Sequence, residues 1–146
     1  MGVVLDVVCA LITREESVLL CQRADGDHLA GWWEFPGGKV EEGESAADAV
    51  RREIEEELAC LIEIMEKPVL PSVEHDYPDR SLRLQGFRSR LADCSPEPCA
   101  LEHAAIDWVP FGDVEEVALA EADRKLWNAA RGVIEGGTPV RDGEEG

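Results

Sequence analysis

The segment from Ser45 to Ala59 constrains the fold most strongly, because it has the pattern of one amphipathic helix with a charged edge. Ser45 followed by Asp48 forms a Ser-x-x-Asp capping box, which predicts that a helix begins there. After that start, apolar residues recur at steps of three and four, as on a helix face that packs against a core. This face consists of Val50, Ile54, Leu58 and Leu61.

Three acidic residues border the apolar face. At the helical spacing of about 100° per residue, Glu53, Glu56 and Glu57 lie within one arc about 100° wide. Glu55 points away from this arc, towards water. Like charges three and four residues apart cost roughly 0.2–0.5 kcal/mol per pair, and no Lys or Arg follows at the relieving positions. Two interpretations stay open on spacing alone: a solvated helix face, or oxygen ligands for a hard divalent cation such as Mg²⁺.

The overall charge limits the possible partners. The 146 residues include 32 acidic and 14 basic side chains, which give a formal net charge of −18. Nucleic acids and anionic membranes are recognised through Lys and Arg, so neither is expected as a partner. An anionic ligand would need a metal ion to bridge it to this chain. No apolar run reaches the roughly 18 residues of a membrane helix, and no signal peptide is recognisable, so a cytoplasmic protein is expected.

The five cysteines predict free thiols and no disulfide framework. Their number is odd and no Cys-x-x-Cys pair occurs, which leaves the alternative of a zinc site without support in the spacing. The five are Cys9, Cys21, Cys60, Cys94 and Cys99, of which the first three lie among apolar neighbours and are expected to be buried.

The remaining segments alternate between strand and helix patterns. Strands are expected at 3–13, 18–23, 82–91 and 105–111, the first two as a hairpin, and a second helix is expected over 122–133. The stretch 24–36 is expected to be a loop, and the pair Gly37-Gly38 to interrupt regular structure. This order predicts a single α/β layered domain with a mixed sheet over residues 1–135, followed by a mobile tail at 136–146.

The sequence GKVEEGESAADAVRREIEEELAC, which starts at Gly38, closely resembles the Nudix box of the Nudix hydrolases. It matches the box in its first glycine, in Glu44 after five intervening residues, and in the Arg-Glu and Glu-Glu pairs of the helix. One position departs, because Ala59 stands where the family has glycine. Alanine suits a helical end better than a left-handed turn, so the helix is expected to end in a slightly different way.

The resemblance extends from about Val4 to Trp127 and is strongest to the MutT-type subgroup, which cleaves nucleoside triphosphates. It rests on CQRADGDHLAGWWEFPGGKVEEGES, YPDRSLRL, LEHAAIDW and LAEAD. It implies the Nudix fold, an α/β/α sandwich around a mixed sheet. It also implies metal-dependent hydrolysis to a monophosphate and pyrophosphate, with Mg²⁺ as the cofactor and Mn²⁺ as a substitute. The last two motifs are especially similar to those of relatives that act on cytidine triphosphates, and oxidised guanine triphosphates are the other substrates expected.

The resemblance also implies which residues form the site. The metal ligands would be Glu53, Glu56, Glu57, the backbone carbonyl of Gly38 and Glu102. Arg52 would hold Glu53 through a charged hydrogen bond, and Glu44 would be a structural partner near the helix start. The general base is either Glu53 or Glu102, whereas His103 is expected to be a surface neighbour of the latter.

The resemblance also implies substrate contacts. Arg23 would meet phosphate or base, and Lys39 would meet phosphate. Phe35, Trp32 and Trp33 would line the nucleotide pocket, with at least one of the three expected in the core instead. Asp123 stands at the position that reads the base in the subgroup, although a first-turn acid that complements the helix dipole is the alternative there. A carboxylate only accepts hydrogen bonds, which favours the N–H-rich edges of cytosine, guanine and 8-oxoguanine.

Two other functions stay open on the sequence. One is hydrolysis of another nucleoside diphosphate derivative such as ADP-ribose, and the other is a catalytically silent module that binds nucleotides. The intact Arg52, Glu53, Glu56 and Glu57 favour an enzyme over a silent module. Either a monomer or a homodimer is compatible with the sequence.

Overall fold

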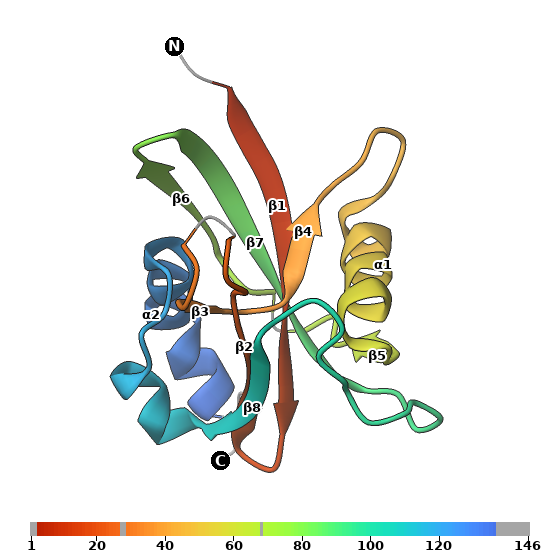
Figure 1. Ribbon diagram of the computed structural model, residues 1–146. Coiled ribbons are helices and arrows are strands. Elements are labelled where there is room, and N and C mark those ends of the chain that lie inside the picture. The colour runs from red at the N-terminus through yellow and green to blue at the C-terminus, as the bar shows by residue number, and fades with distance from the viewer. Residues whose placement is uncertain (1–2, 27–28, 68, 137–146) are drawn as a thin grey trace.

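The computed structural model describes residues 3–26, 29–67 and 69–136, and within them the chain forms a mixed eight-stranded sheet between two helices (Figure 1). Five strands follow the order β3-β2-β1-β7-β5, while β4 pairs with β1, β6 with β7 and β8 with β2. The strands are β1 (Val4–Arg14), β2 (Ser17–Gln22), β3 (Trp33–Glu34), β4 (Gly37–Lys39), β5 (Ile62–Ile64), β6 (Ser72–Tyr77), β7 (Arg80–Leu91) and β8 (Ala105–Pro110).

Strand β1 lies at the centre of the sheet. It pairs in parallel with β7 from Val4↔Ser81 to Ile12↔Ser89, and all other pairs are antiparallel, so the predicted mixed sheet is confirmed. The predicted first hairpin is also confirmed, with Thr13 opposite Val18.

The two faces of β1 supply two separate cores, because successive side chains of a strand point to opposite faces. Leu11 packs in the cluster that contains Leu126 and Trp127 of α2 (Glu121–Glu135). Ile12 packs in the cluster that contains Ile54 of α1 (Ala46–Leu58). Each helix therefore covers one face of the sheet, as Figure 1 shows, and the predicted α/β/α sandwich is confirmed.

The prediction for Gly37-Gly38 is wrong, since these glycines form strand β4 instead of a break. They pair with Cys9 and Val8 of β1, and a Cβ at Gly37 would collide with the backbone carbonyl of Val8. Glycine allows this close approach of two backbones. The expected loop at 24–36 likewise contains the short strand β3, which pairs with the end of β2.

Helix α1 begins as predicted but ends differently. The Ser45 side chain accepts a 3.0 Å hydrogen bond from the Asp48 amide, which confirms the N-cap. Ala59 adopts the left-handed conformation with φ 54° and ψ 36°, so the expectation that alanine would avoid this turn is wrong. Because the helix ends at Leu58, Leu61 does not belong to its apolar face and its side chain is 41% exposed.

Helix α2 follows the 3₁₀ helix η1 (Phe111–Glu116) and starts without a side-chain cap of its own. The Tyr77 hydroxyl, at the end of β6, accepts a 2.9 Å hydrogen bond from the Ala122 amide and satisfies one donor of the first turn. The packing of β6 thus fixes where α2 begins. The tail expected at 136–146 lies, apart from Gly136, outside the described residues.

The cysteines agree with the sequence prediction. All five are free thiols, and Cys9, Cys21 and Cys60 are buried. Burial raises the pKa of Cys60 to about 11, so its thiol stays protonated at neutral pH. Within the described residues, none of the helices has the length and apolar character needed to span a membrane.

Candidate active site

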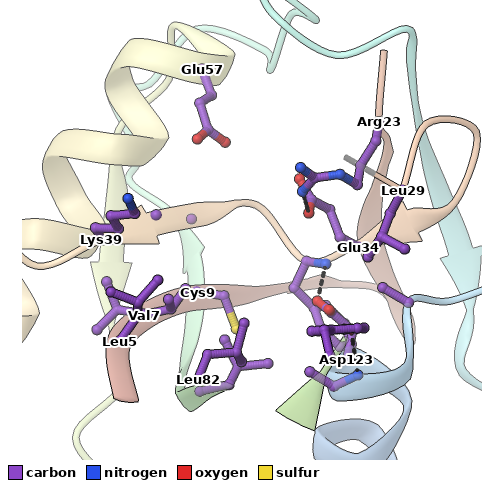
Figure 2. A pocket seen from close by; sticks show the side chains of 18 of the residues that line it. Leu5, Val7, Cys9, Arg23, Leu29, Glu34, Lys39, Glu57, Leu82 and Asp123 are labelled. Carbon is purple, nitrogen blue, oxygen red and sulfur yellow. Dashed lines mark hydrogen bonds and ion pairs between the residues drawn. The ribbon is translucent and has the colours of Figure 1, made fainter. Parts of the chain in front are cut away.

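A cavity of about 300 Å³ opens between the end of α1 and the start of α2 (Figure 2). Its floor is apolar and comes from the central strands β1 and β7, through Val7, Cys9 and Leu82 among others. Carboxylates stand at two of its sides: Glu57 reaches in from α1, and Asp123 from the first turn of α2, as Figure 2 shows. Its size and its few convergent polar groups on apolar walls are typical of a small-molecule site.

The three acidic residues of the predicted arc differ in burial. The Glu53 and Glu57 side chains are 17% and 10% exposed, and that of Glu56 is 54% exposed. Glu57 Oε1 is buried and has no hydrogen-bond partner. Burial first, then a hydrogen bond with Glu53 and the charges of Glu34 and other acids, raise the pKa of Glu57 to about 9. An acidic side chain without a cationic partner is thus held inside the protein, and in the metal-free state its carboxyl is protonated at neutral pH.

Arg52 organises the arc from its outer side. It donates two hydrogen bonds to Glu44, of 2.7 and 3.0 Å, and one of 3.0 Å to Glu53. It also donates to the backbone carbonyl of Lys39, which fixes the strand that precedes the helix. The guanidinium holds the pKa of Glu44 down to about 2. Arg52 thus contacts both Glu53 and Glu44, and it lies between the strand that precedes the helix and the acidic arc.

The donor set around Glu57 fits a hard divalent cation. Carboxylate oxygens are the donors that Mg²⁺ prefers, and the unpartnered Glu57 Oε1 is the kind of atom that a cation would satisfy. A Cβ at Gly38 would collide with the Glu53 carboxylate, so glycine leaves the backbone open at this point. Within the described residues, no group of three His, Cys, Asp or Glu side chains is gathered in a geometry that could hold a metal as it stands.

The loop that carries Glu102 lies beside the end of α1. The Leu101 amide donates a 3.1 Å hydrogen bond to the Glu57 carbonyl, and Glu102 lines the cavity. The prediction that His103 is a surface neighbour is wrong. Its side chain is only 7% exposed, because it turns inward and lies 2.9 Å from Glu34, with Glu57 Oε1 4.0 Å away.

The opposite side of the cavity carries two of the predicted substrate residues, Arg23 and Asp123, as Figure 2 shows. Arg23 forms a 2.6 Å ion pair with Glu34, and both line the cavity. Asp123 Oδ2 accepts a 2.9 Å hydrogen bond from the Phe35 amide, shown dashed in Figure 2. Burial, with a smaller effect from Glu34, raises the pKa of Asp123 to about 8. Asp123 is therefore largely protonated at neutral pH, which corrects the assumption that it is ionised there.

The aromatic residues divide between the cavity and its surroundings. Phe35 and Lys39 line the cavity as predicted. Neither tryptophan does: Trp33 packs against the core of α2, and Trp32 is 42% exposed. The expectation that at least one of the three aromatic residues belongs to the core is met by Trp33, which packs against the same cluster as Phe35.

Three further residues of the cavity wall were missed in the sequence. Glu34, Tyr77 and Arg80 all line it. Arg80 begins β7 within the motif YPDRSLRL, so that motif was a signal that could have identified it. Tyr77 belongs to the same motif, and Glu34 lies in the motif CQRADGDHLAGWWEFPGGKVEEGES, but their contacts are with residues 45 and 69 positions away and could not be read from the local pattern.

Comparisons with known proteins agree with this geometry. The family described as "NUDIX domain" matches residues 7–129. A protein of Escherichia coli named CTP pyrophosphohydrolase is 35% identical over 125 residues, which cover 86% of this chain and 90% of that protein. A protein of Proteus vulgaris named 8-oxo-dGTP diphosphatase is 38% identical over 81 residues, or 56% of this chain and 68% of that one.

Solved structures show the same similarity in three dimensions. The E. coli ORF135 protein superposes with a TM-score of 0.78 at 30% identity, covering 96% of each chain. A MutT NUDIX hydrolase from Burkholderia pseudomallei superposes with a TM-score of 0.74 at 29% identity, covering 88% of this chain and 98% of that one. With the α/β/α sandwich, the acidic helix and the family match in agreement, the chain belongs to the Nudix hydrolase family.

Proposed function

We propose that this protein is a divalent-metal-dependent nucleoside triphosphate diphosphatase that clears cytidine-type or oxidised guanine triphosphates from the nucleotide pool. The observation that carries the proposal is the buried carboxylate of Glu57 with an unpartnered oxygen, beside Glu53, at one side of a cavity that has Asp123 at the other. Hydrolysis would yield a monophosphate and pyrophosphate. The relatives from P. vulgaris and E. coli bear names with these two substrates.

The acidic side would bind the triphosphate through a cation. Glu53, Glu56, Glu57, the Gly38 carbonyl and Glu102 would hold Mg²⁺ or Mn²⁺, which supplies charge neutralisation for phosphate and acidifies a bound water. A cation is needed between protein and substrate, because the protein has a formal charge of −18 and the substrate is a polyanion.

The chain's own residues orient the reaction. Arg52 bonds both Glu44 and Glu53, so the Glu53 carboxylate is held against the Gly38 backbone. The general base is either Glu53, which is held in this way, or Glu102, which reaches the cavity from its loop. Lys39 and Arg23 line the cavity and provide positive charge for the phosphates or the base.

The base would be read by Asp123. Its Oδ2 accepts from the Phe35 amide, which fixes the carboxyl group at the wall of the cavity. In its ionised form, which predominates above pH 8, this carboxylate accepts from the amine of cytosine or from N1–H and the amine of guanine, whereas thymine and uracil offer a carbonyl at the corresponding place. A mismatched buried pair costs about 1–3 kcal/mol, which corresponds to tenfold or greater discrimination.

A panel of nucleotides tests the proposal. The wild-type protein with Mg²⁺ is expected to release pyrophosphate from dCTP, CTP or 8-oxo-dGTP faster than from dTTP or UTP, and to be inactive with EDTA. Glu56→Gln should abolish turnover because it removes a ligand charge, whereas Glu55→Gln on the outer face of the same helix is the matched control.

Other outcomes would favour the alternatives. Turnover of ADP-ribose without turnover of any triphosphate would indicate a different Nudix hydrolase. Nucleotide binding by calorimetry without any turnover in Mg²⁺ or Mn²⁺ would indicate a catalytically silent module. Retention of near wild-type turnover in a folded Glu56→Gln protein would contradict the metal assignment.

A further inference from the structure

One carboxylate, that of Glu34, joins the two sides of the cavity. Its Oε1 accepts a 2.6 Å hydrogen bond from Arg23, and its Oε2 lies 2.9 Å from His103 Nε2. A carboxylate oxygen only accepts, so His103 Nε2 carries the hydrogen of this bond. The contact spans 69 positions of sequence, from strand β3 to the loop before β8.

The loop around His103 is held at both ends by backbone hydrogen bonds. On one side the Leu101 amide donates to the Glu57 carbonyl at 3.1 Å. On the other side the Ala104 amide donates to the Gln22 carbonyl at 2.9 Å. Glu102 and His103 lie between these anchors and both line the cavity, but Glu102 is exposed whereas the His103 side chain is held against Glu34. The contact of His103 with Glu34 can therefore set where the neighbouring Glu102 lies.

We propose that the Glu34–His103 hydrogen bond is a positioning pair, which fixes the 101–104 loop and thereby holds the Glu102 carboxylate over the carboxylates of α1. This inference rests on the proposed function, because Glu102 matters only if it acts in the reaction. His103 itself is a positioning residue, since its directed polar contact is with Glu34, and Glu57 Oε1 at 4.0 Å is beyond hydrogen-bonding distance.

A purely space-filling His103 would behave differently from a positioning one. An apolar residue could fill the volume of the imidazole ring, but only a donor at the Nε2 position can bond Glu34. Gln places its amide nitrogen near that position, whereas Ala removes the donor. His103→Gln and His103→Ala therefore separate the hydrogen bond from the packing, and Cys99→Ala, at an exposed side chain two residues before the loop, is the matched control.

Kinetics and amide exchange test the pair. With Mg²⁺ and dCTP or 8-oxo-dGTP, His103→Ala should lower kcat about tenfold or more while KM changes much less, since misplaced catalytic groups mainly affect the chemical step. His103→Gln should restore most of kcat. Glu34→Ala should lower kcat as well, and should also raise KM because it releases Arg23. The double variant Glu34→Ala/His103→Ala should have a kcat no lower than that of Glu34→Ala alone, because both changes remove the same bond.

Hydrogen exchange on the metal-free protein gives a readout independent of activity. The Leu101 and Ala104 amides should exchange about fivefold faster or more in His103→Ala, and at wild-type rates in His103→Gln and Cys99→Ala. Unchanged exchange and kcat in His103→Ala, or a His103→Gln protein as impaired as His103→Ala, would overturn the proposal. If the wild type hydrolysed no nucleotide, the proposed function would fail, while the exchange experiment would still decide whether the pair fixes the loop.

Discussion

Replacing Glu57 by Gln should stabilise the metal-free protein, although the same change should abolish its activity. The Glu57 carboxyl has a pKa of about 9 in the folded protein against 4.5 when solvated, mainly because it is buried. At pH 7 the unfolded chain is therefore ionised at this position and the folded protein is protonated. A Gln side chain has no charge to lose on folding, and its amide can donate to Glu53 as the protonated acid does.

The magnitude follows from linkage. An acid whose pKa is raised in the folded state lowers the free energy of unfolding as pH rises above its pKa in the unfolded chain. The loss is about 1.36 kcal/mol per pH unit and stops once the pH passes the pKa of the folded state. For Glu57 the penalty is absent below pH 4.5, grows to about 3 kcal/mol at pH 7, and is complete only above pH 9. Glu57→Gln should remove it, which corresponds to a rise in Tm of roughly 10 °C for a domain of this size.

Urea unfolding in EDTA at pH 5, 7 and 8.5 measures this effect, with Glu55→Gln as the exposed control on the same helix. The gain from Glu57→Gln should increase with pH, and the control should stay within about 0.5 kcal/mol of the wild type. Added Mg²⁺ should stabilise the wild type and leave the variant almost unchanged. A variant that is less stable than the wild type in EDTA, or a gain that does not depend on pH, would refute the reasoning.

Three further predictions concern single positions. Gly38→Ala should lower activity about a hundredfold with little loss of stability, because the new Cβ displaces only the end of the Glu53 side chain. In Gly37→Ala the new Cβ would collide with backbone atoms, so thermal melts should show an unfolded protein. Ala59→Gly should raise the free energy of unfolding by about 0.5 kcal/mol in urea titrations, because it relieves a left-handed alanine. The KM for dCTP should fall relative to that for dTTP as pH rises through 8, where Asp123 ionises, and Asp123→Asn should abolish this pH dependence.

The local pattern of the chain predicted helix α1 well. The cap at Ser45, the apolar face and the acidic arc depend on contacts within one or two helical turns, and such contacts are readable from spacing. The mixed sheet followed from the order of elements. The α/β/α sandwich requires only that one helix packs on each face of the sheet, and it does not depend on the details of the loops.

The errors arose where tertiary contacts decide the conformation. Gly37 and Gly38 resemble a turn in isolation, yet the close approach of β1 makes them a strand. Ala59 is left-handed because the chain must leave α1 at once to form β5, at a local cost that packing offsets. His103 contacts Glu34, 69 positions away, and the pKa of Asp123 is raised mainly by burial in the folded protein, with a smaller effect from the same distant Glu34.

Hydrolysis in water enriched in heavy oxygen tests the central claim most directly. Wild-type protein with Mg²⁺ and dCTP or 8-oxo-dGTP should yield a monophosphate and pyrophosphate, with the heavy oxygen in the pyrophosphate, as expected for attack at the β-phosphorus. Mass spectrometry of the two products measures where the label lies. A nucleoside diphosphate and inorganic phosphate as products, or label found only in the monophosphate, would contradict the proposed reaction.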